Sequence, residues 1–400
     1  MDDQDERQAI SYFGTTNGRV PHKRFGIFQA DRLFHMYSLG RTGAGKTTLL
    51  ETLVLQDILS GRGCAVLDPH GDLAARLVAQ VPESRRADLV YLNVPDATQP
   101  YGYNPLRRVR TDKIPLAASG LLEALKKLWS DSWGVRMEHV LRNAIYALLE
   151  YGDATLPDVL RILSEKQFRS EVIKHVKNEQ VRAFWRDEFP RYSVPFQKDA
   201  IAPIQNKVGA FLTDPRLYRL LTKPPLDLSM RRLMDQGKVL IVNLAKGELG
   251  EDSANLLGAL LLSTIGVAAF SRADMPEKER RPFFLYIDEF QNFTTLAVAT
   301  MVSELRKYKV GLVLAHQHLH QLEPDVRHAV LANVGTIVVF RLGPEDAPII
   351  SRELSPVFEA DDLTRLPSHD IAVKLMIDGA ASRPFSATTL HPDALSDFLN

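Results

Sequence analysis

The clearest chemical signal in this sequence is the segment Gly40-Arg41-Thr42-Gly43-Ala44-Gly45-Lys46-Thr47, which matches the phosphate-loop pattern G-x-x-x-x-G-K-[ST] at every fixed position. Its glycines let backbone N–H groups converge on phosphate oxygens, because no Cβ stands in the way. We expect Lys46 to neutralise the β- and γ-phosphates of a nucleoside triphosphate and Thr47 to offer its hydroxyl to Mg²⁺. The predicted nucleotide-binding residues are Gly40, Arg41, Thr42, Gly43, Ala44, Gly45, Lys46, Thr47 and Thr48.

The residues around this segment fit the same interpretation. The apolar run Phe34–Leu39 predicts a strand, and residues Thr47–Gln56 predict a helix whose N-terminus faces the phosphates. The alternative is a glycine-rich turn that matches the pattern by chance. A strand before the loop and a helix after it argue against that alternative.

A second chemical signal is the pair Asp288-Glu289, which directly follows the apolar run Phe283–Ile287. An apolar strand that ends in two carboxylates is what a Walker B element requires. We expect Asp288 to hold Mg²⁺ and Glu289 to orient or deprotonate the attacking water. The alternative is an ordinary pair of solvated carboxylates at a strand end, and the phosphate loop makes it the weaker one.

The next predicted strand, Val310–Ala315, ends at His316-Gln317. A polar amide at the tip of the strand beside Walker B is well placed to sense the γ-phosphate, although an ordinary loop glutamine is the alternative for Gln317. His316, His318 and His320 alternate in this loop. A metal site there is disfavoured, because the sequence offers no cysteine or compact carboxylate set nearby.

The elements that must position these residues are apolar runs separated by helical stretches. The predicted strands are Cys64–Leu67, Leu89–Asn93, Val239–Asn243, Phe283–Ile287, Val310–Ala315, Thr336–Arg341 and Ile371–Met376. Their apolarity is continuous rather than alternating, which indicates strands covered on both faces. We therefore predict an α/β fold with a mostly parallel sheet flanked by helices.

Strand-like runs are absent between about Thr111 and Arg232, where helical periodicity dominates. We interpret this stretch as an all-α domain inserted into one sheet domain. The predicted borders give an N-terminal extension at 1–22 and the first part of the core at 23–110. The insertion follows at 111–232, and the second part of the core at 233–400.

The charges of the chain balance, with 49 Lys and Arg residues against 49 Asp and Glu residues. DNA contacts would therefore have to be local, or be built by several subunits around a shared surface. The basic clusters best suited to phosphates are Arg107–Arg110 and Arg231-Arg232. Their alternative is a solvated surface, which is the usual role of charge runs.

Other features favour a soluble protein of the reducing cytosol. Cys64 is the single cysteine, which excludes an internal disulfide. The acidic, polar start of the chain does not resemble a signal peptide. The longest uncharged run, Ser253–Phe270, contains polar residues and is marginal in length for a membrane span. We expect it to form a buried helix packed on a sheet.

Taken together, these pieces resemble the FtsK/HerA superfamily of P-loop motor ATPases, and within it the TraD/TraG-type coupling proteins of conjugation and type IV secretion. The resemblance extends from about Arg24 onward. Besides the signals above, it is carried by Asp31-Arg32, His35-Met36, Asp68–Leu73, Asn104–Leu106, Trp133–Glu138, Asn206–Gly209, Asn243–Gly247, Asp288–Gln291 and Ala315–Gln317.

The resemblance implies a RecA-like P-loop ATPase core and a homo-oligomeric, hexameric ring that hydrolyses ATP and moves DNA through its pore. It implies that Lys46 and Thr47 bind phosphate and Mg²⁺, that Asp288 and Glu289 form Walker B, and that Gln317 is the sensor. Arg306 matches the position from which such ATPases send an arginine into the neighbouring subunit's site. A solvated helix-end cation is the alternative for Arg306, and Arg136 and Arg341 are rivals for its role.

The chain departs from membrane-anchored coupling proteins, which begin with transmembrane helices that it lacks. Either another subunit supplies the anchor, or a relaxase, a secretion-channel subunit or a nuclease is the partner of a soluble relative. Two other functions remain open at this point. One is a motor that moves a protein substrate into a secretion channel. The other is a nucleotide-gated scaffold for a partner enzyme, although Glu289 disfavours a pure scaffold.

Overall fold

A computed structural model describes residues 8–18, 22–129, 133–222 and 224–397 of the chain. The chain forms two compact units, and each is traversed more than once. The first unit comprises Met1–Tyr91, Arg231–Leu244 and Arg272–Asn400, and the second comprises Leu92–Met230 and Ala245–Ser271. The predicted domain borders at 22/23, 110/111 and 232/233 stay a prediction.

The first unit is built on an 11-stranded sheet with the order β2-β1-β15-β12-β11-β3-β10-β9-β4-β8-β5. Its central strands, from β11 to β8, run parallel, and β12, β15, β1 and β2 extend it with antiparallel pairings. The strands are β1 (Ile10–Thr16), β2 (Arg24–Phe28), β3 (Met36–Leu39), β4 (Gly63–Asp68), β5 (Leu89–Asn93), β8 (Val239–Asn243), β9 (Phe283–Ile287), β10 (Val310–His316), β11 (Thr336–Val339), β12 (Asp370–Lys374) and β15 (Phe385–Thr389), and a ribbon adds β13 (Met376–Ile377) and β14 (Ala380–Ala381).

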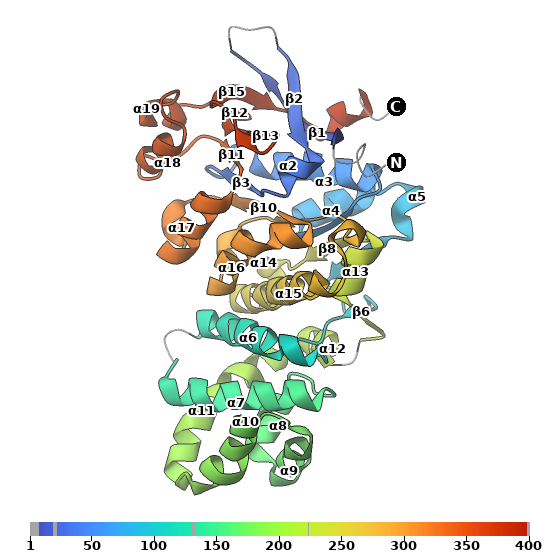
Figure 1. Cartoon of the computed structure of the whole chain (residues 1–400), viewed down its shortest axis with the longest axis vertical. Coiled ribbons are helices and arrows are strands. Elements are labelled where there is room, and N and C mark those ends of the chain that lie inside the picture. The colour runs from blue at the N-terminus through green and yellow to red at the C-terminus, as the bar shows by residue number, and fades with distance from the viewer. Residues whose placement is uncertain (1–7, 19–21, 130–132, 223, 398–400) are drawn as a thin grey trace. The chain divides into compact units, whose positions relative to one another are not determined.

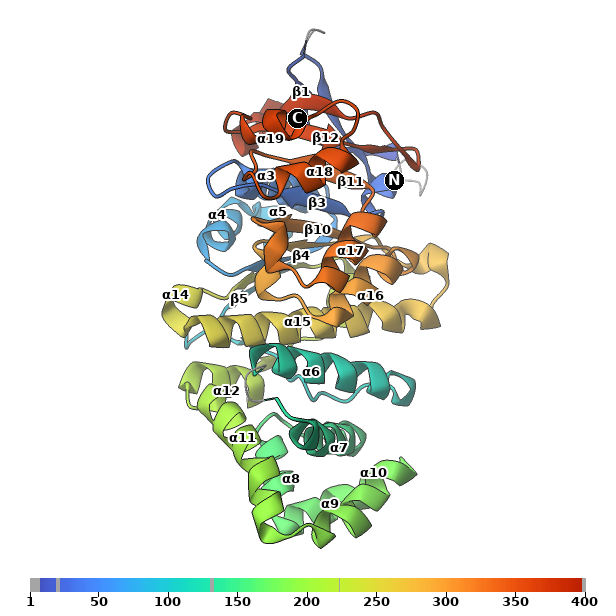
Figure 2. The ribbon, with the colours of Figure 1, turned by 90° about the vertical axis from the view of Figure 1, so that its left-hand side faces the viewer.

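Helices cover both faces of this sheet, as Figure 2 shows for α3 and α4 on one side and α16 and α17 on the other. The chain moves along the sheet in one direction from β3 through β4 to β5 and returns through β8, β9 and β10 to β11. Since crossovers between parallel strands are right-handed as a rule, the two directions place the connecting helices on opposite faces. The helices are α2 (Gln29–Arg32), α3 (Lys46–Leu59), α4 (Asp72–Gln80), α5 (Glu83–Arg86), α13 (Met230–Gln236), α16 (Leu296–Glu304), α17 (Pro324–Asn333), α18 (Ala347–Glu353) and α19 (Ala360–Thr364). Short helical turns are η5 (Arg272–Asp274), η6 (Glu277–Glu279), η7 (Phe290–Asn292), η8 (Leu305–Tyr308), η9 (Leu319–Gln321) and η10 (Pro392–Asp397).

The central strands are buried along their whole length, which explains their continuous apolarity. Every residue of β3, β4, β9 and β10 is buried, and most of α3 is buried as well. The predicted mostly parallel sheet with flanking helices is therefore confirmed. The antiparallel strands β1, β2 and β15 were not among the predicted strands, and β3 begins two residues later than the run Phe34–Leu39, because His35 has a positive φ of 69° that no strand continues.

The second unit is mainly helical, and α6 and α15 lie side by side in it (Figure 1). Its helices are α6 (Ile114–Leu128), α7 (Val135–Tyr151), α8 (Asp158–Ser164), α9 (Lys166–His175), α10 (Glu179–Ala183), α11 (Val194–Leu212), α12 (Pro215–Thr222), α14 (Lys246–Leu249) and α15 (Glu251–Ser271). Its shorter elements are η1 (Thr111–Lys113), η3 (Phe184–Glu188), η4 (Phe189–Arg191), β6 (Tyr101–Gly102) and β7 (Leu226–Asp227).

The predicted apolar helix at Ser253–Phe270 is α15. Together with the turn that follows it, Glu251–Asp274 is the one described segment that is long and apolar enough to cross a membrane. In the folded chain, 61% of its most apolar window is buried. Its contacts with α6 fit the predicted buried helix, and the predicted packing of that helix on a sheet stays a prediction.

Candidate functional site

The predicted site residues gather at the carboxyl edge of the parallel sheet of the first unit. The loop Gly40–Gly45 follows β3, Asp288-Glu289 follows β9, and Gln317 follows β10. Because β3 pairs with β10 and β10 pairs with β9, all in parallel, the three loops leave the sheet at adjacent positions. This is where ligands bind in open α/β sheets.

Backbone hydrogen bonds hold the glycine-rich loop from several sides. Gly40 N donates to His316 O at 3.2 Å, Arg41 N donates to Arg341 O at 2.9 Å, and His369 N donates to Ala44 O at 2.9 Å. The loop thus takes its shape from segments that are far apart in the sequence.

Gly45 shows why this shape requires glycine. Its φ is 120°, a value that L side chains rarely adopt, and a Cβ there would lie 2.9 Å from Nδ1 of His369 and 3.0 Å from the ring of Phe340. Gly43 also has a positive φ, of 73°. The loop therefore presents backbone N–H groups at the N-terminus of α3, an arrangement that suits phosphate.

Lys46 lies inside this loop, where only 5% of the residue is exposed. Its ammonium donates to Gly40 O at 2.7 Å and to Arg41 O at 3.2 Å. Burial lowers the pKa of Lys46, while the carboxylates of Glu289 and Asp288 act in the opposite direction. A buried cation that rests on loop carbonyls is placed to exchange them for phosphate oxygens.

Asp288 and Thr47 meet at the mouth of the loop, where Thr47 Oγ1 donates to Asp288 Oδ2 at 3.2 Å. Burial raises the pKa of Asp288 to about 6, and the neighbouring carboxylates of Glu289 and Asp68 contribute to the rise. The carboxylates of Asp288, Glu289 and Asp68 outnumber the nearby ammonium of Lys46, and the Thr47 hydroxyl completes a pair of oxygen donors with Asp288. These two residues therefore fit Mg²⁺, a hard cation that prefers oxygen ligands and keeps several waters.

Glu289 lies beside this pair, 7% exposed, with a left-handed backbone (φ 46°) that turns its side chain out of the strand direction. Both of its carboxylate oxygens accept hydrogen bonds from amides. Gln317 Nε2 donates to Oε1, and Gln291 Nε2 donates to Oε2 at 2.7 Å. Thr42 Oγ1 donates to Gln317 Oε1 at 3.0 Å, so Gln317 links the phosphate loop to Glu289.

Several of these contacts could not be predicted from the residue types and their spacing. Gln291 was predicted only as part of the motif Asp288–Gln291, Thr42 was predicted to bind the nucleotide but not to contact Gln317, and Asp346 was not among the predicted site residues. Asp346, 3% exposed, accepts from Leu319 N at 3.1 Å and lies 3.3 Å from His318 Nδ1, and it thereby fixes the loop after Gln317. The spacing of Gln291 two residues after Glu289 could have suggested its contact.

Two other predicted features have structural roles. The carboxylate of Asp68 accepts from His70 N and Ala74 N, both at 2.9 Å, and so stabilises the turn that leads into α4. Burial lowers the pKa of His316 to about 3, with His318, Lys46 and His320 acting in the same direction. Within the described residues, no group of His, Cys, Asp and Glu side chains could hold a metal by itself.

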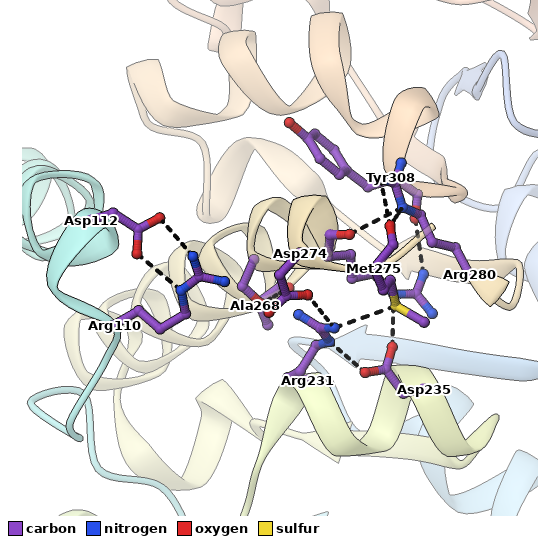
Figure 3. Close-up of polar contacts among 11 residues, drawn as sticks. Arg110, Asp112, Arg231, Asp235, Ala268, Asp274, Met275, Arg280 and Tyr308 are labelled. Carbon is purple, nitrogen blue, oxygen red and sulfur yellow. Dashed lines mark hydrogen bonds and ion pairs between the residues drawn. The ribbon is translucent and has the colours of Figure 1, made fainter. Parts of the chain in front are cut away.

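Arg306 does not join this site in its own chain. It lies in η8, before β10, at the amino edge of the sheet, opposite the phosphate loop. Its guanidinium carbon lies 3.4 Å from the ring centroid of Phe34. The turn that carries it is held by two arginines, because Arg272 donates to Tyr308 O at 2.9 Å and Arg280 donates to Lys307 O. Figure 3 shows Arg280 beside Tyr308.

The arginines predicted to meet DNA phosphates are mostly engaged within the chain, as Figure 3 shows for two of them. Arg231 is ion-paired with Asp235 and, at 2.8 Å, with Asp274. Arg110 pairs with Asp112 at 3.0 Å.

In the same cluster as Arg110, Arg107 lies 3.3 Å from Asp227 and donates to Leu228 O. The charges of these arginines are therefore largely balanced locally.

Residues 28–354 match the family model described as the type IV secretion-system coupling protein DNA-binding domain. Among curated proteins, none matches the chain. Among solved structures, the chain is similar to the plasmid coupling protein TrwB in complex with ADP and Mg²⁺, with 18% identity and a TM-score of 0.69 over 96% of this chain and 95% of that chain.

Two further structures are similar. The unbound, monoclinic form of the conjugative coupling protein TrwB has 17% identity and a TM-score of 0.67 over 92% of this chain and 86% of that chain. VirB4 of Thermoanaerobacter pseudethanolicus has 15% identity and a TM-score of 0.62 over 96% of both chains. At these identities the similarity concerns the fold, and it confirms the predicted P-loop ATPase architecture.

Proposed function

Because this chain belongs to the type IV secretion-system coupling protein DNA-binding domain family, we propose that it is an ATP-hydrolysing ring motor that moves DNA. Membership in this family also confirms the resemblance to coupling proteins. The observation that carries the proposal is the convergence of Lys46, Asp288, Glu289 and Gln317 at one edge of the sheet. That TrwB has been solved with ADP and Mg²⁺ supports ATP and Mg²⁺ as the ligands of this site.

Binding of the nucleotide is assigned to the loop and the start of α3. The loop N–H groups take the phosphate oxygens, and Lys46 leaves the carbonyls of Gly40 and Arg41 for the β- and γ-phosphates. Thr47 and Asp288 would hold Mg²⁺, which supplies positive charge to the phosphates when it is bound. Thr48 follows in the first turn of α3, next to the phosphates.

Hydrolysis is assigned to Glu289. Its carboxylate takes a proton from a water molecule as the water oxygen attacks the γ-phosphorus, and the bond from that phosphorus to the bridging oxygen of ADP breaks. Lys46 balances negative charge on the phosphoryl oxygens. Gln317 contacts both Glu289 and the loop residue Thr42, so it can couple the position of the base to occupation of the loop.

In the proposed ring, a neighbouring subunit supplies further positive charge to the nucleotide site. The guanidinium of Arg306 lies at the opposite edge of the sheet and cannot complete its own site, but a neighbouring subunit could present it. Anchoring of its turn by Arg272 and Arg280 supports a fixed presentation. An arginine that stabilises charge on the transferring phosphoryl group couples turnover to ring geometry. We assign this role to Arg306 in a homo-oligomer, with a hexamer as the expected size.

The family description favours DNA as the cargo, bound without sequence preference in the ring pore. We place the motor in the cytoplasm, where a relaxase, a secretion-channel subunit or a nuclease would be its partner. Protein cargo is the second candidate, and the balanced charge of the chain leaves it open.

Steady-state ATP hydrolysis, measured with and without DNA, tests the proposal. Wild type is expected to hydrolyse ATP faster when DNA is present, and Glu289→Gln is expected to bind ATP without hydrolysing it. Absence of hydrolysis, or equal rates for the two proteins, would refute the ATPase. Hydrolysis that ignores DNA but responds to a secretion substrate would favour the protein-cargo alternative. Loss of DNA binding at high salt would identify phosphate contacts.

A further inference from the structure

Gln291 is the second amide on the carboxylate of Glu289, and the function proposed above does not use it. It lies in η7, two residues after Glu289, and is half-buried. Its Nε2 donates to Glu289 Oε2 at 2.7 Å. The other oxygen, Oε1, accepts from Gln317. Each oxygen of the proposed base therefore has one amide donor.

The two donors are anchored differently. Gln317 is tied to the phosphate loop, because Thr42 donates to its Oε1 at 3.0 Å. The nucleotide will compete for this link, since the γ-phosphate of a bound triphosphate lies at the loop. The contact of Gln291 instead stays within the turn after β9, because its Nε2 donates to a residue only two positions earlier in the chain.

The turn that carries Gln291 is rigid. Phe290 is fully buried and makes edge-to-face contacts with Tyr37, 6.1 Å between ring centroids, and with His316 at 5.1 Å. Thr294 Oγ1 donates to the Gln291 carbonyl at 3.2 Å. A side chain on a packed turn holds its partner within the narrow range of orientations that catalysis requires.

The orientation of Glu289 needs such support. Its backbone is in the left-handed region at φ 46°, where residues other than glycine are uncommon, and its carboxylate stands beside that of Asp288. Repulsion from Asp288 would turn a free Glu289 side chain away, and Lys46 would draw it toward the loop. A fixed amide on Oε2 restrains both movements and leaves a lone pair for water.

We propose that Gln291 is a positioning residue for hydrolysis, which keeps the Glu289 carboxylate aimed at the attacking water while Gln317 responds to the nucleotide. The inference rests on the proposed ATPase function. It assigns separate tasks to the two amides: Gln291 maintains the base, and Gln317 connects it to the phosphate loop.

The test is ATP turnover by the full chain with Gln291→Met, which keeps the length of the side chain and removes its donor, and with Gln291→Glu, which replaces the donor by a carboxylate. The matched control is Asn292→Ala in the same turn. We expect kcat of Gln291→Met to fall about 10- to 100-fold, which is the usual effect of removing a residue that orients a functional side chain by a hydrogen bond. KM and the thermal midpoint should stay near wild type, and Gln291→Glu should fall further.

A double-mutant cycle with Gln317→Met separates positioning from folding. If both amides act on Glu289, the effects on kcat are non-additive, because one carboxylate is shared. A wild-type kcat for Gln291→Met overturns the inference, and so do a parallel loss in Asn292→Ala or a fall in kcat that merely follows the thermal midpoint. In all three cases the ATPase itself stands. Absence of turnover in wild type instead refutes the proposed function, and the inference falls with it.

Discussion

The side-chain amide of Gln317 donates a hydrogen bond to Glu289, across two strands that are adjacent and parallel in the sheet. The same side chain accepts from Thr42 in the phosphate loop at 3.0 Å. One glutamine thus contacts both halves of the candidate site. Through this link, occupation of the phosphate loop by a nucleotide can change the position of the Glu289 carboxylate.

Removal of this link should affect hydrolysis more than binding. Gln317→Met keeps the size of the side chain and removes its polar amide. We expect kcat for ATP to fall about 10- to 100-fold, as for loss of an outer partner of a functional group, and the affinity for ATP to change less than threefold. Stopped-flow binding of a fluorescent ATP analogue and steady-state turnover measure the two quantities. An equal loss of affinity and turnover would show that Gln317 is a binding residue instead.

Gly45→Ala tests whether the loop needs its positive φ. The substitution forces an L side chain to φ 120° and against Nδ1 of His369. Such strain costs roughly 1–3 kcal/mol, and we expect ATP affinity to fall about tenfold or more. Isothermal titration with ATP and urea unfolding provide the measurements.

The control is Gly209→Ala in α11, where an added Cβ meets nothing within 4 Å. Alanine should stabilise this helix by roughly 0.5–1 kcal/mol, because glycine has more freedom to lose on folding. Unchanged ATP affinity in Gly45→Ala would contradict the loop geometry.

His35 predicts a specific pH dependence of stability. Burial lowers the pKa of His35 to about 4, and the charge of Arg306 acts in the same direction. Between the unfolded value of about 6.5 and about 4, the unfolded state binds more protons. The free energy of unfolding should therefore fall as the pH falls through this window, by about 3 kcal/mol from His35.

His35→Asn should remove the part of this slope that His35 contributes and leave the part from His316, whose pKa burial lowers in the same way. Asparagine tolerates the positive φ of this position and can still accept from Leu312 N, which donates to His35 Nδ1 at 3.0 Å. Urea unfolding at several pH values from 4 to 7 measures the slope. His328→Asn, at an exposed position of α17, is the control and should leave the slope unchanged. A wild-type slope in His35→Asn would exclude His35 as its source.

Arg306→Ala tests the assignment of the arginine that acts between subunits. We expect turnover to fall on the order of 10³-fold with ATP binding retained, and Lys307→Ala, next to it, to stay near wild type. Mixing Arg306→Ala with inactive Lys46→Ala should restore activity, because some interfaces then pair an intact loop with an intact Arg306. If the mixture does not recover activity, the arginine that acts on the neighbouring subunit's nucleotide would be Arg136 or Arg341 instead.

The sequence predicted the local parts of this protein well. Each of its three main signals is formed by consecutive residues: the phosphate loop, Walker B and the strand before Gln317. Buried parallel strands also have a continuous apolar pattern that can be recognised in a sequence. The antiparallel strands β1, β2 and β15 were not predicted, because short strands that are only partly buried have a weaker apolar pattern.

Contacts between segments far apart in the sequence could not be predicted. The bonds of Thr42 with Gln317 and of His369 with Ala44 depend on which loops the fold brings together. The charged clusters show the same limit. Arg231 was predicted to be suited to DNA phosphates, whereas in the structure Asp235 and Asp274 balance its charge. Asp274 lies 43 residues away in the sequence.

The measurement that tests the central claim most directly is displacement of streptavidin from biotin at the end of a DNA strand, followed in time with ATP and Mg²⁺. A motor that moves along DNA pushes the streptavidin off, so wild type should speed its release well above the spontaneous rate. Glu289→Gln, or wild type without ATP, should leave that rate unchanged. Release at the spontaneous rate while wild type hydrolyses ATP on the same DNA would contradict DNA translocation.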